Sequence, residues 1–502
     1  MRAALAALTK GCLGALSLWC AALGLLLATA AIAACSFAAG WCYGEHRRSR
    51  AALESVVAGL AARGEFVGVA PAPADPGSTN PDLAANAEKL RGLARSCAIG
   101  RKWPKCRELL GGRLARVGWR SDAAPSHNGG LAWVDVACQL EMAFEVLEDV
   151  HAILDAGRCG PATAVDEAID RAIVPWLAWS AMESLHDLDS AGAIREIARI
   201  RRLADRHSHI PSLDAQLWRC ALLKSAIRLS WEVLQTPALD GKTLEALATL
   251  WAEDQPLAGI SETLRRERSI GIGAFAALVR SMETDAGWRT RLCELGSAMA
   301  ERRDAVGWIG EATAWMRYGL WRVLWADEEL ACFLSSLQIV IDHIDGNASK
   351  LSWSGIRGAW ATAESSLAGR SNRMGLDRLI IGSVGLNGGR AACQVILEYE
   401  AERRMLLIDI ARCRYDLDHG DTPADLGQLV PAYLPRIPLD PMDGMPLRYR
   451  LDPCGGPILY SVGPDCRDDN GSPEKPDSQP AAALSHGRDM VWPIADFPRS
   501  VE

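Results

Sequence analysis

The chain has no excess of positive charge and few aromatic residues other than tryptophan. Its 54 lysine and arginine residues face 62 aspartate and glutamate residues, which gives a formal net charge of −8. A net acidic chain without a basic cluster argues against nucleic acid as the main partner. Phenylalanine and tyrosine number only 6 and 7, against 18 tryptophans. With 49% hydrophobic and 23% charged residues, the composition is that of a globular protein, and it argues against wholesale disorder and against a multi-span membrane protein.

The sequence also lacks the short motifs that mark common active sites. It contains no CxxC, HExxH, GxSxG or P-loop spelling. Residues 271–276 match the GxGxxA spelling, but the charged stretch 263–269 before them cannot be the buried strand that a dinucleotide-binding fold requires. Four of the 15 cysteines lie in an N-terminal apolar run. The other eleven, an odd number, are expected to be mostly buried free thiols.

One long uncharged run covers residues 11–43. A helix needs about 20 apolar residues to cross a bilayer, and lipid selects helix because backbone groups must be satisfied within the segment. We therefore expect a transmembrane helix over residues 11–44, after a flank of residues 1–10. Two alternatives stay open: the stretch 32–35 (IAAC) resembles a bacterial lipobox that would lipidate Cys35, and cleavage at the same place would release the chain.

The middle of the chain has an almost wholly helical pattern. Residues 45–81 are typical of a juxtamembrane helix followed by a Pro/Gly-rich linker, and residues 82–390 predict a large all-α domain. Ser190 and Ser212 are placed to cap two of its helices. Most tryptophans fall within these helices. Their spacing indicates core packing or the lining of a groove, and core packing is favoured because indoles bury large areas.

The last segment, residues 391–502, predicts a small α+β module. Residues 391–419 form a long amphipathic pattern, which Gly420 is placed to end and Pro423 prevents from resuming. Three short strand patterns follow, at 447–451, 458–462 and 489–494. The expected fold class is therefore mainly α, with a transmembrane helix, a large helical domain and a C-terminal antiparallel sheet.

The order of motifs in this module resembles the major pseudopilin of type II secretion systems. The resemblance rests on the helix end 415–420 (YDLDHG), the LxxLVP-like stretch 426–431, the segment 433–449 (YLPRIPLDPMDGMPLRY), the strand 460–465 (YSVGPD) and the triplet 489–491 (DMV). The whole layout is similar to that of single-span planctomycete-type membrane proteins, which pair a helical region with such a module. The chain lacks the Gly-Phe-Thr-Leu-Ile-Glu-type processing site of the pilin class, so we do not expect a processed filament subunit.

The resemblance implies a calcium site, because the loop after the Tyr-Ser-x-Gly strand binds calcium in that family. Asp465 matches the family's Gly-Ala-Asp aspartate, and Asp489 falls near its late aspartate. Asp468 and Asp469 are further carboxylates on the same loop, and composition alone indicates them as ligands of this oxygen-seeking ion. The alternative is a solvated acidic turn that is closed by Asx hydrogen bonds.

Two Glu-x-x-His pairs offer a second candidate metal site. Glu148 and His151 would share one helix face, and Glu183 and His186 another, as in di-iron helical bundles. Such a site also needs carboxylates from two other helices, so polar residues on solvated faces are the favoured interpretation. His207 and a second histidine two residues later flank a loop without carboxylate or thiol company, which is a poor metal site.

These patterns predict a membrane-anchored extracytoplasmic binding or scaffolding protein, of unknown ligand, with a calcium-stabilised C-terminal module. A metal-dependent enzyme with a helical-bundle active site, and an accessory component of a type II secretion or pilus-like assembly, are the alternatives. The arginines and lysine that flank the apolar run do not choose a side. The secretion-type module favours the outer side of a bacterial inner (cytoplasmic) membrane, with envelope or secretion-system proteins as partners, although eleven thiols fit a reducing compartment slightly better.

Overall fold

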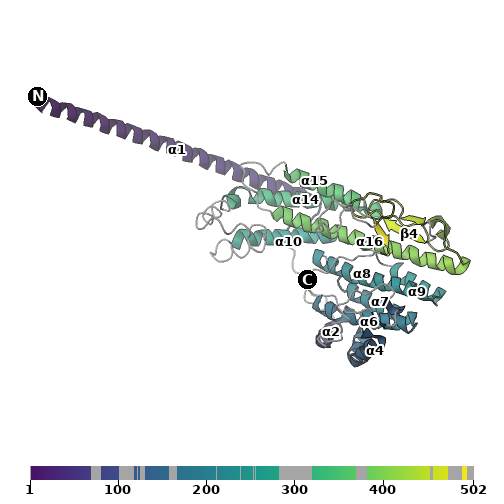
Figure 1. The fold of residues 1–502 in the computed structure, drawn as a ribbon. Coiled ribbons are helices and arrows are strands. Elements are labelled where there is room, and N and C mark those ends of the chain that lie inside the picture. Colours follow the sequence, from purple (N-terminus) through teal and green to yellow (C-terminus); the bar gives the residue numbers. More distant parts are fainter. Residues whose placement is uncertain are drawn as a thin grey trace. The chain divides into compact units, whose positions relative to one another are not determined.

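The computed structural model is mainly helical, with a small antiparallel sheet near the C-terminus, and this confirms the predicted fold class (Figure 1). The chain divides into two compact units, Met1–Gly68 with Ile272–Ser335 and Ser366–Val384, and Val69–Gly271 with Ser336–Ser365 and Gly385–Glu502. The structure describes residues 2–68, 81–100, 118–120, 123–124, 131–157, 167–210, 212–237, 239–252, 254, 256–281, 319–368, 381–452, 456–472 and 489–493.

The α-helices are bounded as follows: α1 Arg2–Ala62, α2 Pro81–Gly100, α4 Trp133–Met142, α5 Phe144–Asp155, α6 Glu167–His186, α7 Ser190–Asp205, α8 Leu213–Leu234, α9 Gly241–Ala252, α10 Ile260–Ser281, α14 Ala326–Gly346, α15 Trp353–Ala368 and α16 Ile381–His419. Short 3-10 turns lie at η2 (Gly118–Arg120), η3 (Ala348–Lys350) and η4 (Leu426–Leu429). A two-residue pairing joins β1 (Ala123–Ala124) to β2 (Leu131–Ala132).

Helix α1 changes its surroundings along its length. Every side chain from Leu25 to Gly40 is exposed, and by length and composition the helix could cross a membrane. From Trp41 onward one face is covered, and Glu45 and Ser49 are buried there. The predicted apolar N-terminal helix is therefore confirmed, with the composition that an anchor and a signal sequence share. It continues without a break through the predicted juxtamembrane helix, whereas most of the predicted linker lies outside the described residues.

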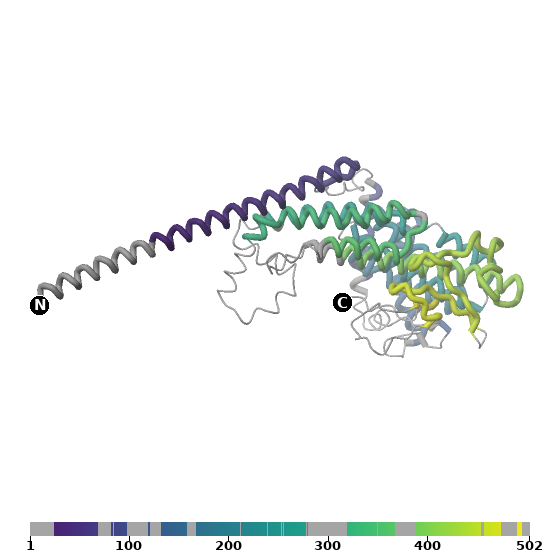
Figure 2. The backbone as a smooth tube through the Cα atoms, turned by 90° about the horizontal axis from the view of Figure 1, so that it is seen from above, coloured from purple at the N-terminus to yellow at the C-terminus, as the bar shows by residue number. Residues whose placement is uncertain are grey.

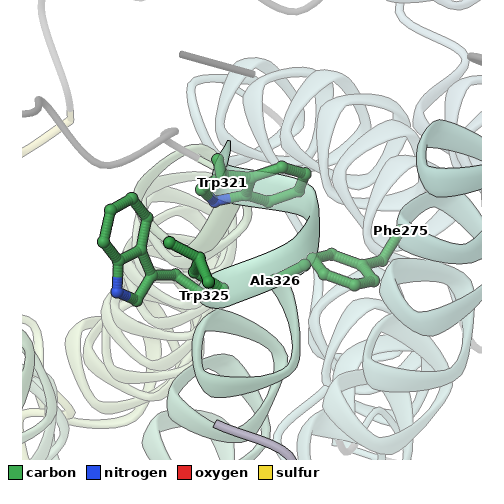
Figure 3. Packing of buried hydrophobic residues seen from close by; sticks show 5 residues of the cluster. Phe275, Trp321, Trp325 and Ala326 are labelled. Atoms are coloured by element: carbon green, nitrogen blue, oxygen red, sulfur yellow. The ribbon is translucent and has the colours of Figure 1, made fainter. Parts of the chain in front are cut away.

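An apolar cluster lies in the first unit, where the helical turn 319–324 leads into α14 (Figure 3). Phe275 of α10 meets Trp321 edge-on, with ring centroids 5.8 Å apart. On the next turn of the chain, Trp325 meets Trp41 of α1 edge-on at 6.4 Å. Trp41 and Cys42, which directly follow the exposed apolar stretch of α1, pack against this cluster.

In the second unit, helices that follow one another in sequence pack together. Helix α6 packs on α7, and α7 packs on α8 (Figure 1). The indoles lie in the core of this stack, and none of the tryptophan side chains that the structure describes is exposed. The buried indoles agree with core packing, which was the favoured interpretation of the tryptophan spacing, whereas Trp218 and Trp231 are half-buried. Buried indoles of this stack are Trp133, Trp176, Trp179 and Trp251.

The C-terminal module combines the second half of α16 with a sheet of strand order β3-β4-β5. The strands are β3 (Arg448–Leu451), β4 (Pro457–Ser461) and β5 (Met490–Trp492), and both pairings are antiparallel. They lie beside α16 in both views (Figure 1, Figure 2). One tie is the hydrogen bond from Trp492 Nε1 in β5 to Asp409 Oδ2 in α16, at 2.9 Å. The predicted strands are confirmed to within a few residues, but α16 begins ten residues before the predicted start at residue 391.

Two glycines test the assigned helix boundaries, one that ends a helix and one that lies inside a helix. Gly420 ends α16 with φ +73°, so Gly420→Ala is expected to lower the free energy of unfolding by about 1 kcal/mol. Gly358 lies within α15 with open space around an added Cβ, so Gly358→Ala is expected to raise it by up to about 1 kcal/mol. Urea unfolding of the full chain in detergent measures both. Shifts of the same sign would contradict the assigned helix end.

Candidate functional site

The C-terminal module is organised around one fully buried carboxylate, that of Asp440. Met442 N and Val462 N each donate to it at 2.9 Å, Ser461 Oγ donates at 2.8 Å, and Arg448 Nη1 donates at 3.1 Å. Burial raises the pKa of Asp440, while the amide and hydroxyl donors act in the opposite direction. Because its donors come from its own turn, from β3, and from the end of β4 and the residue after it, this carboxylate fixes the turn against the sheet.

Arg448 of β3 lies among three acidic side chains. Its guanidinium donates to both oxygens of Asp443, and its Nη1 lies 3.1 Å from Asp440 Oδ2. Its Nε lies 3.6 Å from Asp468 Oδ2. The cation therefore balances part of the negative charge where the loop after β4, called the acidic loop here (described over residues 463–472), approaches the sheet.

The acidic loop is closed by Asp489, which stands at the start of β5. Its carboxylate accepts from Asp469 N at 3.1 Å and from Gly471 N at 2.6 Å, and its side chain is buried. Burial raises the pKa of Asp489, and the charges of Asp468 and Asp469 add to this rise, while the two amide donors lower it. Asp468 Oδ1 accepts from Asn470 N at 2.9 Å and from the Tyr460 hydroxyl at 3.1 Å. Asp489 is therefore bonded to the stretch of loop that contains two of the other predicted calcium ligands, Asp468 and Asp469.

Asp465 stands apart from that group, next to α15. Its carboxylate accepts from Arg467 N at 3.1 Å, and its backbone carbonyl accepts from Arg357 Nη1 at 3.1 Å. Trp353 Nε1 donates to the carbonyl of Pro464 at 2.8 Å, which fastens the beginning of the loop to the first turn of α15. The start of this helix is also capped by the module, since Trp353 N donates to Pro441 O at 2.8 Å.

Three of the four predicted ligands, Asp465, Asp468 and Asp489, accept backbone amides with their carboxylates, whereas Asp469 contributes its own backbone amide to Asp489. Within the described ranges, no group of three or more aspartate, glutamate, histidine or cysteine side chains could hold a metal ion. Asp465 and Asp468 each accept the amide two residues later, as in the acidic turn with Asx hydrogen bonds. Calcium stays a prediction, and it would require the Asp465 carboxylate to move toward those of Asp468, Asp469 and Asp489.

The two Glu-x-x-His pairs make separate contacts. His151 Nε2 lies 3.4 Å from Glu196 Oε2 of α7, and Glu148 is exposed. His186 Nδ1 lies 2.9 Å from the carbonyl oxygen of Trp119, and its ring stacks on another indole. Burial raises the pKa of Glu183, and the charge of a neighbouring aspartate adds to the rise. The metal-dependent enzyme therefore stays a prediction, with no grouped ligands among these four residues to support it.

His207 lies in the turn after α7, as expected, but it has a carboxylate partner that the sequence did not indicate, within a buried polar group. His207 Nε2 lies 2.6 Å from Asp170 Oδ2, and both side chains are buried. The same carboxylate oxygen accepts from Trp218 Nε1 at 2.9 Å. Asp170 therefore joins α6 to α8 and to the turn after α7, which is a structural role that spacing in the sequence did not indicate.

A larger buried ionic cluster joins α16 to the helical stack. Asp254, just after α9, pairs with Arg219 Nη2 of α8 at 2.5 Å and accepts the hydroxyl of Tyr399 of α16. Arg403 Nη1, one turn later in α16, donates to Trp251 O at 2.7 Å. Burial would raise the pKa of Asp254, but the charge of Arg219 and the hydrogen bonds from Tyr399 and Arg219 outweigh it and hold that pKa below its usual range.

A second buried ion pair follows on the same faces of α8 and α16. Lys224 Nζ lies 2.9 Å from Glu402 Oε1, whose side chain is only 3% exposed. Burial raises the pKa of Glu402, and the charge of Lys224 lowers it. The alternation of cations and carboxylates along α16 was visible in the sequence, but nothing in it distinguished buried pairs from a solvated face.

Loss of Arg219 tests the cluster. Arg219→Met leaves the Asp254 charge buried without its ion-pair partner, and we expect a loss of about 3–5 kcal/mol in the free energy of unfolding at pH 7. As a control, Arg195→Met removes an exposed pair with Asp189 and is expected to cost under about 1 kcal/mol. Denaturant unfolding of both variants gives the comparison, and equal losses would contradict a buried ionic junction.

The pH dependence of the same variants gives a second measurement. The pKa of Asp254 is lower in the folded chain than in the unfolded chain, so its contribution to stability is present at neutral pH. That contribution is lost as pH falls from about 4, the unfolded value, through the folded value. The acid limb of stability is therefore expected to be shallower in Arg219→Met than in the wild-type chain.

Comparison of the chain with protein-family models, with curated protein sequences and with solved structures gives no match.

Proposed function

We propose that this chain is a membrane-anchored binding or scaffolding protein whose body is extracytoplasmic. The observation that supports the proposal is the exposed apolar stretch of α1. Residues Leu25 to Gly40 cover about 24 Å of helix at ~1.5 Å per residue, and all of their side chains are exposed. With the uncharged residues 11–24 before them, the stretch exceeds the thickness of a bilayer's apolar core, about 30 Å. A lipid environment would cover this surface.

The scaffolding part of the proposal rests on the second unit. Its described tryptophans are buried or half-buried, and α8 is joined to α16 by buried ion pairs. Such cross-links favour a stable body that can present a binding surface. The side on which the body lies is inferred from the pseudopilin resemblance of the C-terminal module.

An accessory role in a type II secretion or pilus-like assembly is the second candidate. Its support is the order of a long helix followed by a three-stranded antiparallel sheet, together with the motifs that carry the resemblance. Co-purification of secretion-system components with the tagged chain after mild solubilisation would favour this role. A tagged chain that is recovered without them would count against it.

Fractionation and a reporter test the anchor and its orientation. Full-length chain is expected to stay in the membrane pellet after alkaline carbonate, and a reporter fused after Glu502 is expected to be active only if it functions outside the cytoplasm. Release by carbonate would contradict the anchor. Activity of a cytoplasmic reporter would contradict the proposed side.

Calcium titration tests the remaining part of the proposal. Calcium is expected to raise the thermal unfolding midpoint of the chain after removal of bound metal with EGTA. If Kd is a hundredth of the free calcium concentration, the gain is about 2.7 kcal/mol. The double variant Asp468→Asn/Asp469→Asn should lose the shift, and Asp421→Asn, which changes a carboxylate at the end of α16, should keep it. No shift in the wild-type chain would remove calcium from the account.

A further inference from the structure

In the part of the chain that the structure describes, the helical turn 319–324 has apolar side chains that are buried in the protein and others that are exposed. Trp321 and Leu324 belong to the apolar cluster and are buried. Leu320 and Val323 are 37% and 56% exposed. Exposed aliphatic side chains next to a buried apolar face make this turn a candidate for contact with a second apolar environment.

Two hydrogen bonds fix the level of this turn along α1. Nδ1 of His46 lies 2.7 Å from the carbonyl oxygen of Val323, and Glu328 N donates to Ser49 Oγ at 2.8 Å. Val323 pairs with His46, and the later residue Glu328 pairs with the later residue Ser49. The segment 319–328 and α1 therefore run in the same direction. Leu320, which precedes Val323 by about one helical turn, therefore lies closer to the exposed apolar end of α1.

That level coincides with the expected membrane interface. Trp41, the residue at which α1 becomes covered, packs edge-on against Trp325. Tyr43 is 64% exposed, and Arg47 and Arg48 follow on the next turn. Indole and phenol rings favour the interfacial layer, and arginines beyond them extend toward the headgroups. Leu320 and Val323 thus lie near the level along α1 at which its exposed apolar stretch ends.

We propose that the turn 319–324 is a second membrane contact, with Leu320 and Val323 in the interfacial layer of the bilayer that α1 crosses. The occupant is the lipid surface, because the turn lies at the level where the apolar face of α1 ends. The inference rests on the proposed membrane span of α1. It would hold the first unit to the bilayer at two places and restrict its rotation about α1.

Photo-crosslinking to lipid tests the contact in the full chain in nanodiscs. The photoreactive residue p-benzoylphenylalanine replaces Leu320 or Val323 in single variants. Phe37, in the exposed apolar stretch, is the positive control position. Ala58 is the matched negative control: it is exposed on the same helix, about 22 Å beyond Tyr43 along the axis at ~1.5 Å per residue. Intact-mass spectrometry counts lipid adducts, and thermal unfolding checks that each variant is folded.

Lipid adducts are expected at Leu320 and Val323 with yields near that of Phe37 and several-fold above that of Ala58. Adducts at Phe37 with only background at the two test positions, or adducts there with protein in place of lipid, would overturn the second contact and leave the anchor intact. No adduct at Phe37 would overturn the anchor itself. Labelling of the unmodified chain with a diazirine phospholipid, followed by peptide mapping, gives the same comparison without substitution.

Discussion

The second unit depends on one buried ionic junction, at which the end of α9 meets α7, α8 and α16. The carboxylate of Asp254 is shared by Arg219 and the Tyr399 hydroxyl. Beside it, the fully buried indole of Trp251 lies under the guanidinium of Arg201, 5.0 Å from the ring centroid, and its carbonyl accepts from Arg403. A charge removed from water is costly unless its partners are in place, so this junction tolerates only one register of α16 against the stack.

The same logic recurs at a smaller scale in the C-terminal module. Asp440 is buried where a turn, β3 and β4 meet, and four donors compensate its burial. Asp489 similarly closes the acidic loop by accepting two backbone amides. In both places a carboxylate accepts backbone amides for which the small sheet that the structure describes offers no partner strand. Asp489, which resembles a metal ligand in the sequence, therefore has a structural role in this arrangement. This role is compatible with a calcium ion only if the loop rearranges around it.

Local signals in the sequence were sufficient to predict the helical fold class and the C-terminal sheet, but not the two-residue pairing of β1 with β2. Gly420 ended α16, the strand alternation located the sheet, and Ser212 caps α8 by accepting from Ala215 N. At α7 the N-cap is Asp189 and not the predicted Ser190. Both residue types cap helices well, so the sequence alone did not distinguish between these two neighbours. The start of α16 was placed too late because the glycines of residues 382–389 do not favour a helix on their own.

Long-range partners could not be predicted in this way. Asp254 and Tyr399 are 145 positions apart, and Asp170 and His207 are 37 apart. A single sequence contains the charges but not the pairing, so helix faces that become buried looked like solvated faces. For the candidate site, the sequence identified the acidic loop, but it could not show that the Asp465 carbonyl would accept from Arg357 of α15 while the Asp489 carboxylate accepted the amides of Asp469 and Gly471.

The central claim is that lipid covers α1 up to Trp41, while protein covers one face of it from there on. Cys35 on that stretch and Cys138 on α4 are both exposed thiols. Without a bilayer, a maleimide is therefore expected to label both of them. Peptide-resolved alkylation of the full chain in nanodiscs measures the difference. The account predicts that Cys138 is labelled while Cys35 is protected until detergent is added. Equal labelling of the two thiols before detergent would contradict it.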